Sequence, residues 1–227
     1  MADIAPELPE SLEDQPGQHA SARWRRRKQA RPGEILEAAL SVFAEKGYAA
    51  TRMEDIAARA GVTKGTIYLY FEGKEAVFKS LVREAIGSRV AEAIESVHRY
   101  EGPAADLIRM ALGMVANLIT EDNRVVLPKI VLAEAGNFPE LARFYREEII
   151  DKGLGMLKSA IARGIARGEF RPVDLDHAAR LCVAPLILAI IWRTTFARFD
   201  AEPYDYRGLV DTHAEVLLSG LKAGVTP

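Results

Sequence analysis

The segment from Thr51 to Phe71 constrains the fold of this chain more than any other part of its sequence. It reads Thr-Arg-Met-Glu-Asp-Ile-Ala-Ala-Arg-Ala-Gly-Val-Thr-Lys-Gly-Thr-Ile-Tyr-Leu-Tyr-Phe. Ala57 is small enough for a second helix to cross closely, Gly61 can supply a left-handed turn, and Thr63 can cap the helix that follows. These offsets predict two short helices packed across a tight turn, the helix-turn-helix arrangement. The alternative is an ordinary helical hairpin.

Helix signals also precede this segment. From Pro32, apolar residues recur at helical spacing up to Gly47, where we expect a left-handed glycine to end the first helix. Thr51 and Glu54 have the spacing of a capping box, in which the Thr hydroxyl accepts from the amide of Glu54 and the Glu side chain reaches back. The sequence therefore predicts three helices in a small unit over residues 32–79.

The third of these helices should run from Thr63 to about Phe71, with Ile67 and Phe71 in the core. Beyond it the apolar spacing stays helical and no stretch alternates with period two. Further helices are expected at about 74–100, 103–120, 123–135, 139–167, 174–199 and 205–222. We therefore predict an all-α protein with an N-terminal helix-turn-helix domain and a larger helical domain over residues 80–227.

Charge is unevenly distributed along the chain, although the net charge is only -2. Residues 1–21 carry five acidic and no basic residues, whereas residues 22–80 carry a net charge of +5. We expect residues 1–31 to form a disordered acidic leader followed by a basic arm that contains Arg25, Arg26, Arg27 and Lys28. A locally basic segment in a mildly acidic protein indicates an anionic partner, with nucleic acid as the first candidate and a solubilising tail as the alternative.

The chain lacks the sequence signatures of several classes of protein. The longest apolar run, Leu181 to Trp192, has 12 residues and includes Pro185, so no transmembrane helix and no membrane partner are predicted. The N-terminus has no readable secretory signal, and Cys182 has no cysteine partner, which favours a cytoplasmic protein. There is no phosphate-binding glycine loop, no His-x-x-x-His pair and no placed nucleophile, so neither an enzyme nor a cofactor or metal site is expected.

The motif residues resemble the TetR family of bacterial transcriptional regulators over about residues 33–80. The resemblance rests on Thr51-Arg-Met-Glu-Asp-Ile-Ala, on Gly61-Val-Thr-Lys-Gly-Thr-Ile-Tyr-Leu-Tyr-Phe and on Lys74-Glu. One departure is Leu69, where many members carry an aromatic residue. The resemblance implies that the third helix enters the DNA major groove. It also implies that the C-terminal helices form a homodimer and enclose an effector pocket.

The residue types of the third helix are compatible with DNA contacts. Thr63 leaves amides free at the helix N-terminus for a phosphate oxygen, and Lys64 can reach phosphate or a guanine edge. Gly65 allows close approach of the backbone, while Thr66 offers a methyl group and a hydroxyl to base edges.

Four further positions complete the expected interface. Tyr68 and Tyr70 are expected at the DNA backbone or base edges, with packing as their alternative role. Thr51 and Lys74 begin neighbouring helices and are expected to contact phosphate. The basic arm from Arg25 to Lys28 is expected to follow an adjacent minor groove.

The C-terminal half contains two candidates for the dimer interface, the helices near 174–199 and 205–222, which are apolar on more than one side. The alternative is a monomer with a thick core. Flexible methionines, flat aromatic rings and one amide are typical of a pocket for an apolar ligand. The candidate effector contacts are Met110, Met114, Asn117, Phe144, Met156, Trp192 and Phe196.

Taken together, the sequence predicts a homodimeric, ligand-responsive regulator that binds double-stranded operator DNA, with repression implied by the family resemblance. The effector would favour a conformation whose two recognition helices no longer match successive major grooves. The main alternative is a constitutive DNA-binding protein without an effector, which a filled C-terminal core would favour. An all-α enzyme is the alternative of a different class.

Overall fold

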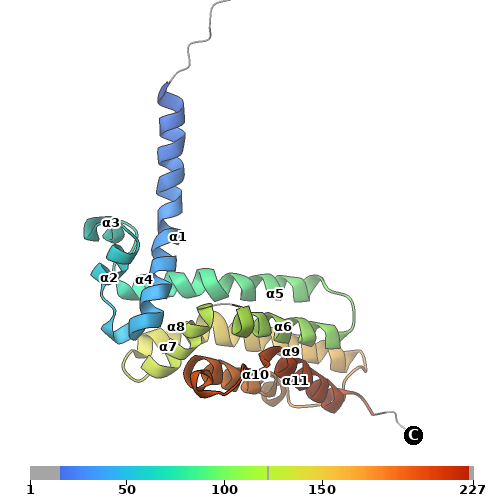
Figure 1. Cartoon of the computed structure of the whole chain (residues 1–227). Coiled ribbons are helices and arrows are strands. Elements are labelled where there is room, and N and C mark those ends of the chain that lie inside the picture. Colours follow the sequence, from blue (N-terminus) through green and yellow to red (C-terminus); the bar gives the residue numbers. More distant parts are fainter. Residues whose placement is uncertain (1–15, 122, 225–227) are drawn as a thin grey trace, which may run out of the picture.

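The computed structural model describes the backbone of residues 16–121 and 123–224, and the side chains of 32–120 and 123–224. Within these ranges every regular element is a helix, which confirms the predicted all-α fold (Figure 1). The α-helices are α1 Pro16–Ala50, α2 Met53–Arg59, α3 Lys64–Tyr68, α4 Lys74–Val82, α5 Ser88–Arg99, α6 Ala104–Glu121, α7 Val126–Glu134, α8 Pro139–Tyr145, α9 Asp151–Ala166, α10 Leu175–Ile191 and α11 Tyr206–Leu221.

Short helical turns continue several of these elements. Three are π-helical, at Arg83–Gly87 (η1), Arg146–Ile150 (η3) and Trp192–Phe196 (η4), and two are 3-10 turns, at Asn123–Val125 (η2) and Ala197–Phe199 (η5). Each π turn lies inside one of the long helices expected from the sequence. A π turn adds one residue to a helix and rotates the following face, while the apolar spacing on either side stays helical. The sequence pattern therefore located the long helices but not these turns.

Helix α1 differs from expectation at both ends. It begins at Pro16, so residues 16–31 are helical in this structure rather than irregular, and their Ala, Arg, Lys and Gln residues are good helix formers. The side chains of Arg25 to Lys28 and all of residues 1–15 lie outside the described part of the chain. Gly47, with φ 74° and ψ 172°, makes a kink, and the helical pattern resumes as far as Ala50.

The start of α2 corrects the predicted capping box. The hydroxyl of Thr51 donates to the carbonyl of Gly47 at 2.6 Å, and only 2% of Thr51 is exposed. The helix begins two residues later, where the carboxylate of Asp55 accepts from the amide of Arg52 at 3.0 Å. Thr51 therefore closes the kink at Gly47 and cannot cap α2 or present its side chain to phosphate.

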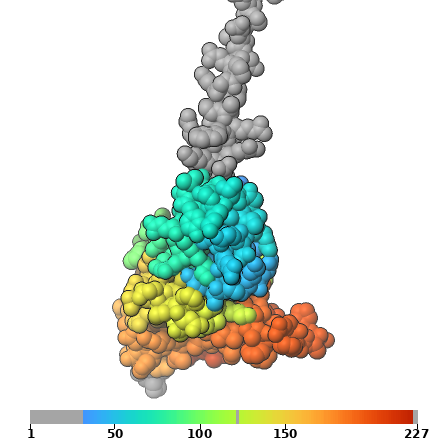
Figure 2. Space-filling view, turned by 90° about the vertical axis from the view of Figure 1, so that its left-hand side faces the viewer, coloured from blue at the N-terminus to red at the C-terminus, as the bar shows by residue number. Residues whose placement is uncertain are grey.

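The core of the N-terminal helices continues into α7 and α8. The rings of Phe43, Tyr48 and Phe78 contact one another, and the ring of Phe138, just before α8, lies 4.9 Å from that of Tyr48. In Figure 2, α7 and α8 (yellow) lie between the N-terminal helices (blue and cyan) and the C-terminal body (orange). These two helices thus connect the two halves of the molecule.

A second core joins α6, α9, α10 and α11. By length and mean hydropathy, the stretch Leu175–Phe199 would be long and apolar enough to cross a membrane. Its buried residues, which include Cys182 and Leu186, pack in this core, so it serves as a central helix of the C-terminal body.

Candidate nucleic-acid interface and apolar cavity

The helices α2 and α3 form the predicted helix-turn-helix. Gly61 has φ 65° at the turn, as expected for a glycine in a left-handed conformation. The hydroxyl of Thr63 accepts from the amide of Thr66 at 3.1 Å, which confirms Thr63 as the N-cap of α3. Ile67 is fully buried and Phe71 nearly so, as predicted, which fixes α3 to the small core. The polar residues of α3 are thereby turned outward.

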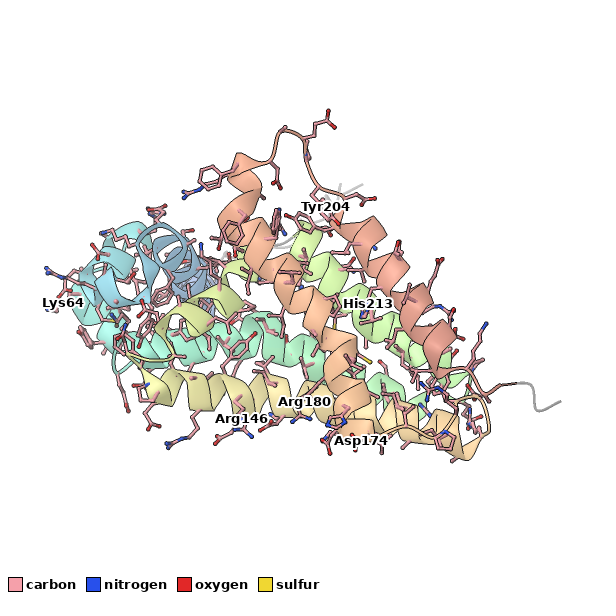
Figure 3. All side chains as sticks on the ribbon, turned by 90° about the horizontal axis from the view of Figure 1, so that it is seen from below. Lys64, Arg146, Asp174, Arg180, Tyr204 and His213 are labelled. Carbon is pink, nitrogen blue, oxygen red and sulfur yellow. The ribbon has the colours of Figure 1, made fainter. Side chains whose placement is uncertain are left out.

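Lys64 stands at the exposed N-terminus of α3, at one extreme of the molecule (Figure 3). Its ammonium lies 2.5 Å from a carboxylate oxygen of Glu54 on α2. This pairing raises the pKa of Lys64 and lowers that of Glu54. The lysine is thus held as a cation at the surface of α3, and an approaching phosphate would compete with Glu54 for it.

The other residues of α3 and the two that follow it differ in exposure. Gly65 and Tyr68 are exposed, and 45% of Tyr68 is accessible, so both can meet DNA. Thr66 is half-buried and its hydroxyl lies 2.9 Å from that of Thr63. Tyr70 packs against the core, in line with its alternative role. Leu69 is 81% exposed, an apolar side chain on the outer surface.

Lys74 corrects the expectation of a phosphate contact. Its ammonium donates to the carbonyls of Tyr48 and Ala49 at 2.7 and 3.1 Å and lies 4.5 Å from the centre of the Tyr48 ring. Burial lowers the pKa of Lys74, and the carboxylate of Glu134 partly opposes this effect. The lysine ties the end of α1 to the start of α4, so two of its three donors bond to carbonyls of the protein.

The C-terminal body contains an apolar cavity of about 260 Å³ between α5, α6, α7, α9 and α10, with the π turns η1 and η3 in its wall. Of the 23 residues that line it, only Arg89 is charged and only Tyr145 is both neutral and able to donate a hydrogen bond from its side chain. Cavities of this kind, mostly apolar with one or two polar groups, are typical of ligand sites.

Only two of the seven predicted effector contacts, Met114 and Met156, line this cavity. Met110 lines a neighbouring hollow, to which Met114 and Met156 also contribute. The amide oxygen of Asn117 accepts from Arg207 on α11, so it joins two helices instead. Phe144 is buried in the core, away from the cavity wall.

Trp192 and Phe196 do not line this cavity, and on η4 they are 42% and 45% exposed. Helix α10 has two apolar faces, which its sequence pattern did not separate. Val183, Leu186 and Ile190 are among the residues that face the cavity. Other apolar side chains of α10, η4 and η5 are exposed, and α11 adds one more exposed apolar side chain. These residues are Leu181, Leu188, Trp192, Phe196, Phe199 and Val216.

Arg89 and Tyr145 also line the cavity but were not expected from the sequence. Arg89 stands between Ile86 and Val90, both buried, and a charge within an apolar stripe was the available signal. Tyr145 is 8% exposed at the end of α8, and burial raises the pKa of its phenol well above the ordinary value.

Two family models match the chain. The model of bacterial regulatory proteins of the tetR family matches residues 35–81, and that of the tetracyclin repressor-like C-terminal domain matches residues 101–211. The chain belongs to the TetR family. It is therefore a DNA-binding transcriptional regulator with an N-terminal helix-turn-helix and a helical C-terminal domain.

Its relatives within the TetR family include a regulator named for fatty acid metabolism and a transcriptional repressor. The fatty acid metabolism regulator protein of Bacillus subtilis is 28% identical over 86% of this chain and 98% of its own length. The repressor KstR2 of Mycobacterium tuberculosis is 32% identical over 72% of this chain and 81% of its own. These relatives are transcriptional regulators, not enzymes.

Solved structures of the family share the fold. The transcriptional regulator FadR from Bacillus subtilis in complex with stearoyl-CoA superimposes with a TM-score of 0.70, at 28% identity, over 83% of this chain and 98% of that one. A TetR-family regulator from Mesorhizobium loti gives 0.66, at 27% identity, over 86% and 98%.

Proposed function

We propose that this protein is a homodimeric repressor that α3 holds on operator DNA and that a small lipophilic effector releases. The observation that carries the proposal is the apolar cavity of about 260 Å³, whose wall includes residues of α7. Because α7 also packs against α1, a ligand that moves α7 would shift the DNA-binding helices. A constitutive DNA-binding protein would need no such cavity.

The effector class follows from the cavity wall and from the relatives. An almost wholly apolar wall favours a long hydrocarbon or fused-ring compound over a polar metabolite. The Bacillus subtilis FadR structure was determined in complex with stearoyl-CoA. We therefore propose a long-chain acyl compound as the first effector to test, acting in the cytoplasm, where the operator lies.

We propose that the DNA contacts are made by Lys64, Gly65, Thr66 and Tyr68, together with the backbone amides that follow Thr63. The surface position of this group supports its role. The basic arm from Arg25 to Lys28 would add contacts to an adjacent minor groove and steepen the dependence of affinity on salt.

The operator experiment measures fluorescence anisotropy of DNA from immediately upstream of the gene, at two salt concentrations. We expect tight, sequence-selective binding that Tyr68→Ala weakens and Tyr204→Ala, an exposed tyrosine on a distant loop (Figure 3), leaves unchanged. Palmitoyl-CoA should release the DNA. Equal binding to scrambled DNA, or indifference to Tyr68→Ala, would overturn the role of α3.

The dimer is proposed to form through the exposed apolar face of α10, η4, η5 and α11. An exposed face rich in leucine and aromatic side chains is typical of an interface between subunits. Leu188→Glu should convert the dimer to a monomer by sedimentation velocity, because it buries a charge at the contact. Leu69→Glu, which changes an exposed leucine in the turn after α3, should leave the dimer intact.

A further inference from the structure

We propose that the cavity and the hollow beside it form one site for an amphipathic ligand, an apolar chain with an anionic head, and that Arg89 binds the head. The inference rests on the proposed function, since it assumes that the cavity holds the effector. It adds the charge of the ligand, its orientation and the residue that recognises it.

The second hollow has a volume of about 290 Å³ and lies along α5 and α6. It shares Arg89, Ala111, Met114 and Met156 with the apolar cavity. Ligand pockets usually have volumes of about 300–1,000 Å³, so each space alone lies just below that range. A ligand that occupies both would have a site of ordinary size.

Methionines form much of the boundary between the two spaces. Met114 and Met156 line both, and Met110 lines the second hollow only. Unbranched thioether side chains change rotamer at low cost and adapt to different ligand shapes. The boundary is therefore built from groups that a chain passing from one space to the other can push aside.

The two spaces differ in chemistry. The side chains of the cavity wall are apolar apart from Arg89 and Tyr145, whereas Arg89, Glu92 and Ser96 bring polar groups to the second hollow. The apolar end of a ligand therefore belongs in the cavity and the polar end in the second hollow.

Arg89 stands where the two spaces meet, half-buried on α5 between the buried residues Ile86 and Val90. A guanidinium next to an apolar wall binds carboxylate or phosphate oxygens more strongly than one in open water, because the local dielectric constant is lower. Glu92 lines only the second hollow, one turn further along α5. Repulsion from its carboxylate would keep the anionic group at the junction, beside Arg89.

The test measures binding of palmitic acid, palmitoyl-CoA and the neutral 1-hexadecanol to the full chain by isothermal titration calorimetry. Arg89→Met keeps the length of the side chain and removes its charge. We expect it to weaken the binding of both anionic ligands, or of one of them, by about tenfold or more. The affinity for 1-hexadecanol should change by less than about twofold. If Arg89→Met loses affinity for palmitic acid, the carboxylate binds at Arg89. If the loss of affinity is confined to palmitoyl-CoA, its phosphates bind there.

Two further variants keep the result interpretable. Arg89→Lys, which retains the charge, should keep most of the preference for anionic ligands. Arg99→Met removes an exposed arginine at the far end of the same helix, where it pairs with Glu95 and lines neither space, and should bind all three ligands as the wild type does.

An equal loss for all three ligands in Arg89→Met, or no loss, would overturn the role of Arg89. If the wild-type protein binds none of the three, the inference is also overturned, whereas the proposed repressor is decided separately by the operator titration. Binding with the expected charge preference but without DNA release would support the site and contradict the proposed function.

Discussion

The carboxylate of Glu134, at the end of α7, accepts a hydrogen bond from the backbone amide of Ala49, at the end of α1, at 3.2 Å. Helix α7 lines the cavity with Pro128, Val131 and Leu132. One hydrogen bond thus joins α7, which lines the cavity, to the C-terminal end of α1, the helix that leads into the helix-turn-helix.

Glu134→Ala is expected to weaken the coupling between ligand binding in the cavity and operator binding. Loss of one hydrogen bond between these elements should reduce the effector-induced change in operator affinity by about two- to tenfold, with ligand affinity little changed. Operator binding measured with and without palmitoyl-CoA checks this. Glu140→Ala, at an exposed position on α8, should leave the change intact. An unaltered response in Glu134→Ala would show that the coupling follows other contacts.

Lys64→Met and Lys74→Met should separate a DNA contact from a structural lysine. The first should lower the slope of log affinity against log salt by about one and leave the free energy of unfolding unchanged. The second should cost about 1–3 kcal/mol of stability, because the carbonyls of Tyr48 and Ala49 lose their donor, and should leave the salt slope nearly unchanged. Urea denaturation and anisotropy titrations measure both. If Lys74→Met instead lowered the salt slope without loss of stability, Lys74 would belong to the DNA interface.

Gly164 on α9 is required by packing. A Cβ added at this position would overlap the ring of Phe170, whereas one added at Gly155 on the same helix has open space. Gly164→Ala should therefore destabilise the protein by about 1–3 kcal/mol, and Gly155→Ala should stabilise it by up to about 1 kcal/mol through helix propensity. Thermal or urea unfolding checks the pair, and similar values for both variants would contradict the packing argument.

Stability should fall as the pH rises above about 10, the ordinary pKa of tyrosine. Burial raises the pKa of Tyr48 to about 12 and that of Tyr145 further. The unfolded chain therefore loses these protons first, so alkaline conditions favour unfolding. Burial lowers the pKa of Lys74, which opposes this trend in part.

Tyr48→Phe and Tyr145→Phe should each flatten the alkaline decline, and Tyr204→Phe, at an exposed tyrosine, should not. Urea denaturation between pH 8 and 11 measures the effect. An unchanged decline in both buried variants would assign it to other groups.

The helical fold and the helix-turn-helix were predictable from the amino-acid sequence alone. These features depend on local signals: Gly61 at the turn, Thr63 at the cap and Ile67 turned inward are set by neighbours a few residues away. The long C-terminal helices were equally visible, because their apolar spacing continues on both sides of each π turn.

Which side chains remain available to contact DNA or a ligand depends on the tertiary structure. Thr51 and Lys74 are residue types that often contact phosphate. In the folded protein, however, the Thr51 hydroxyl donates to the carbonyl of Gly47 and the Lys74 ammonium donates to that of Tyr48. Trp192 and Phe196 are on the exposed side of an apolar helix whose opposite side faces the cavity. Periodicity identifies that a helix is apolar, but only the packing of elements distant in sequence decides which face becomes core, cavity or surface.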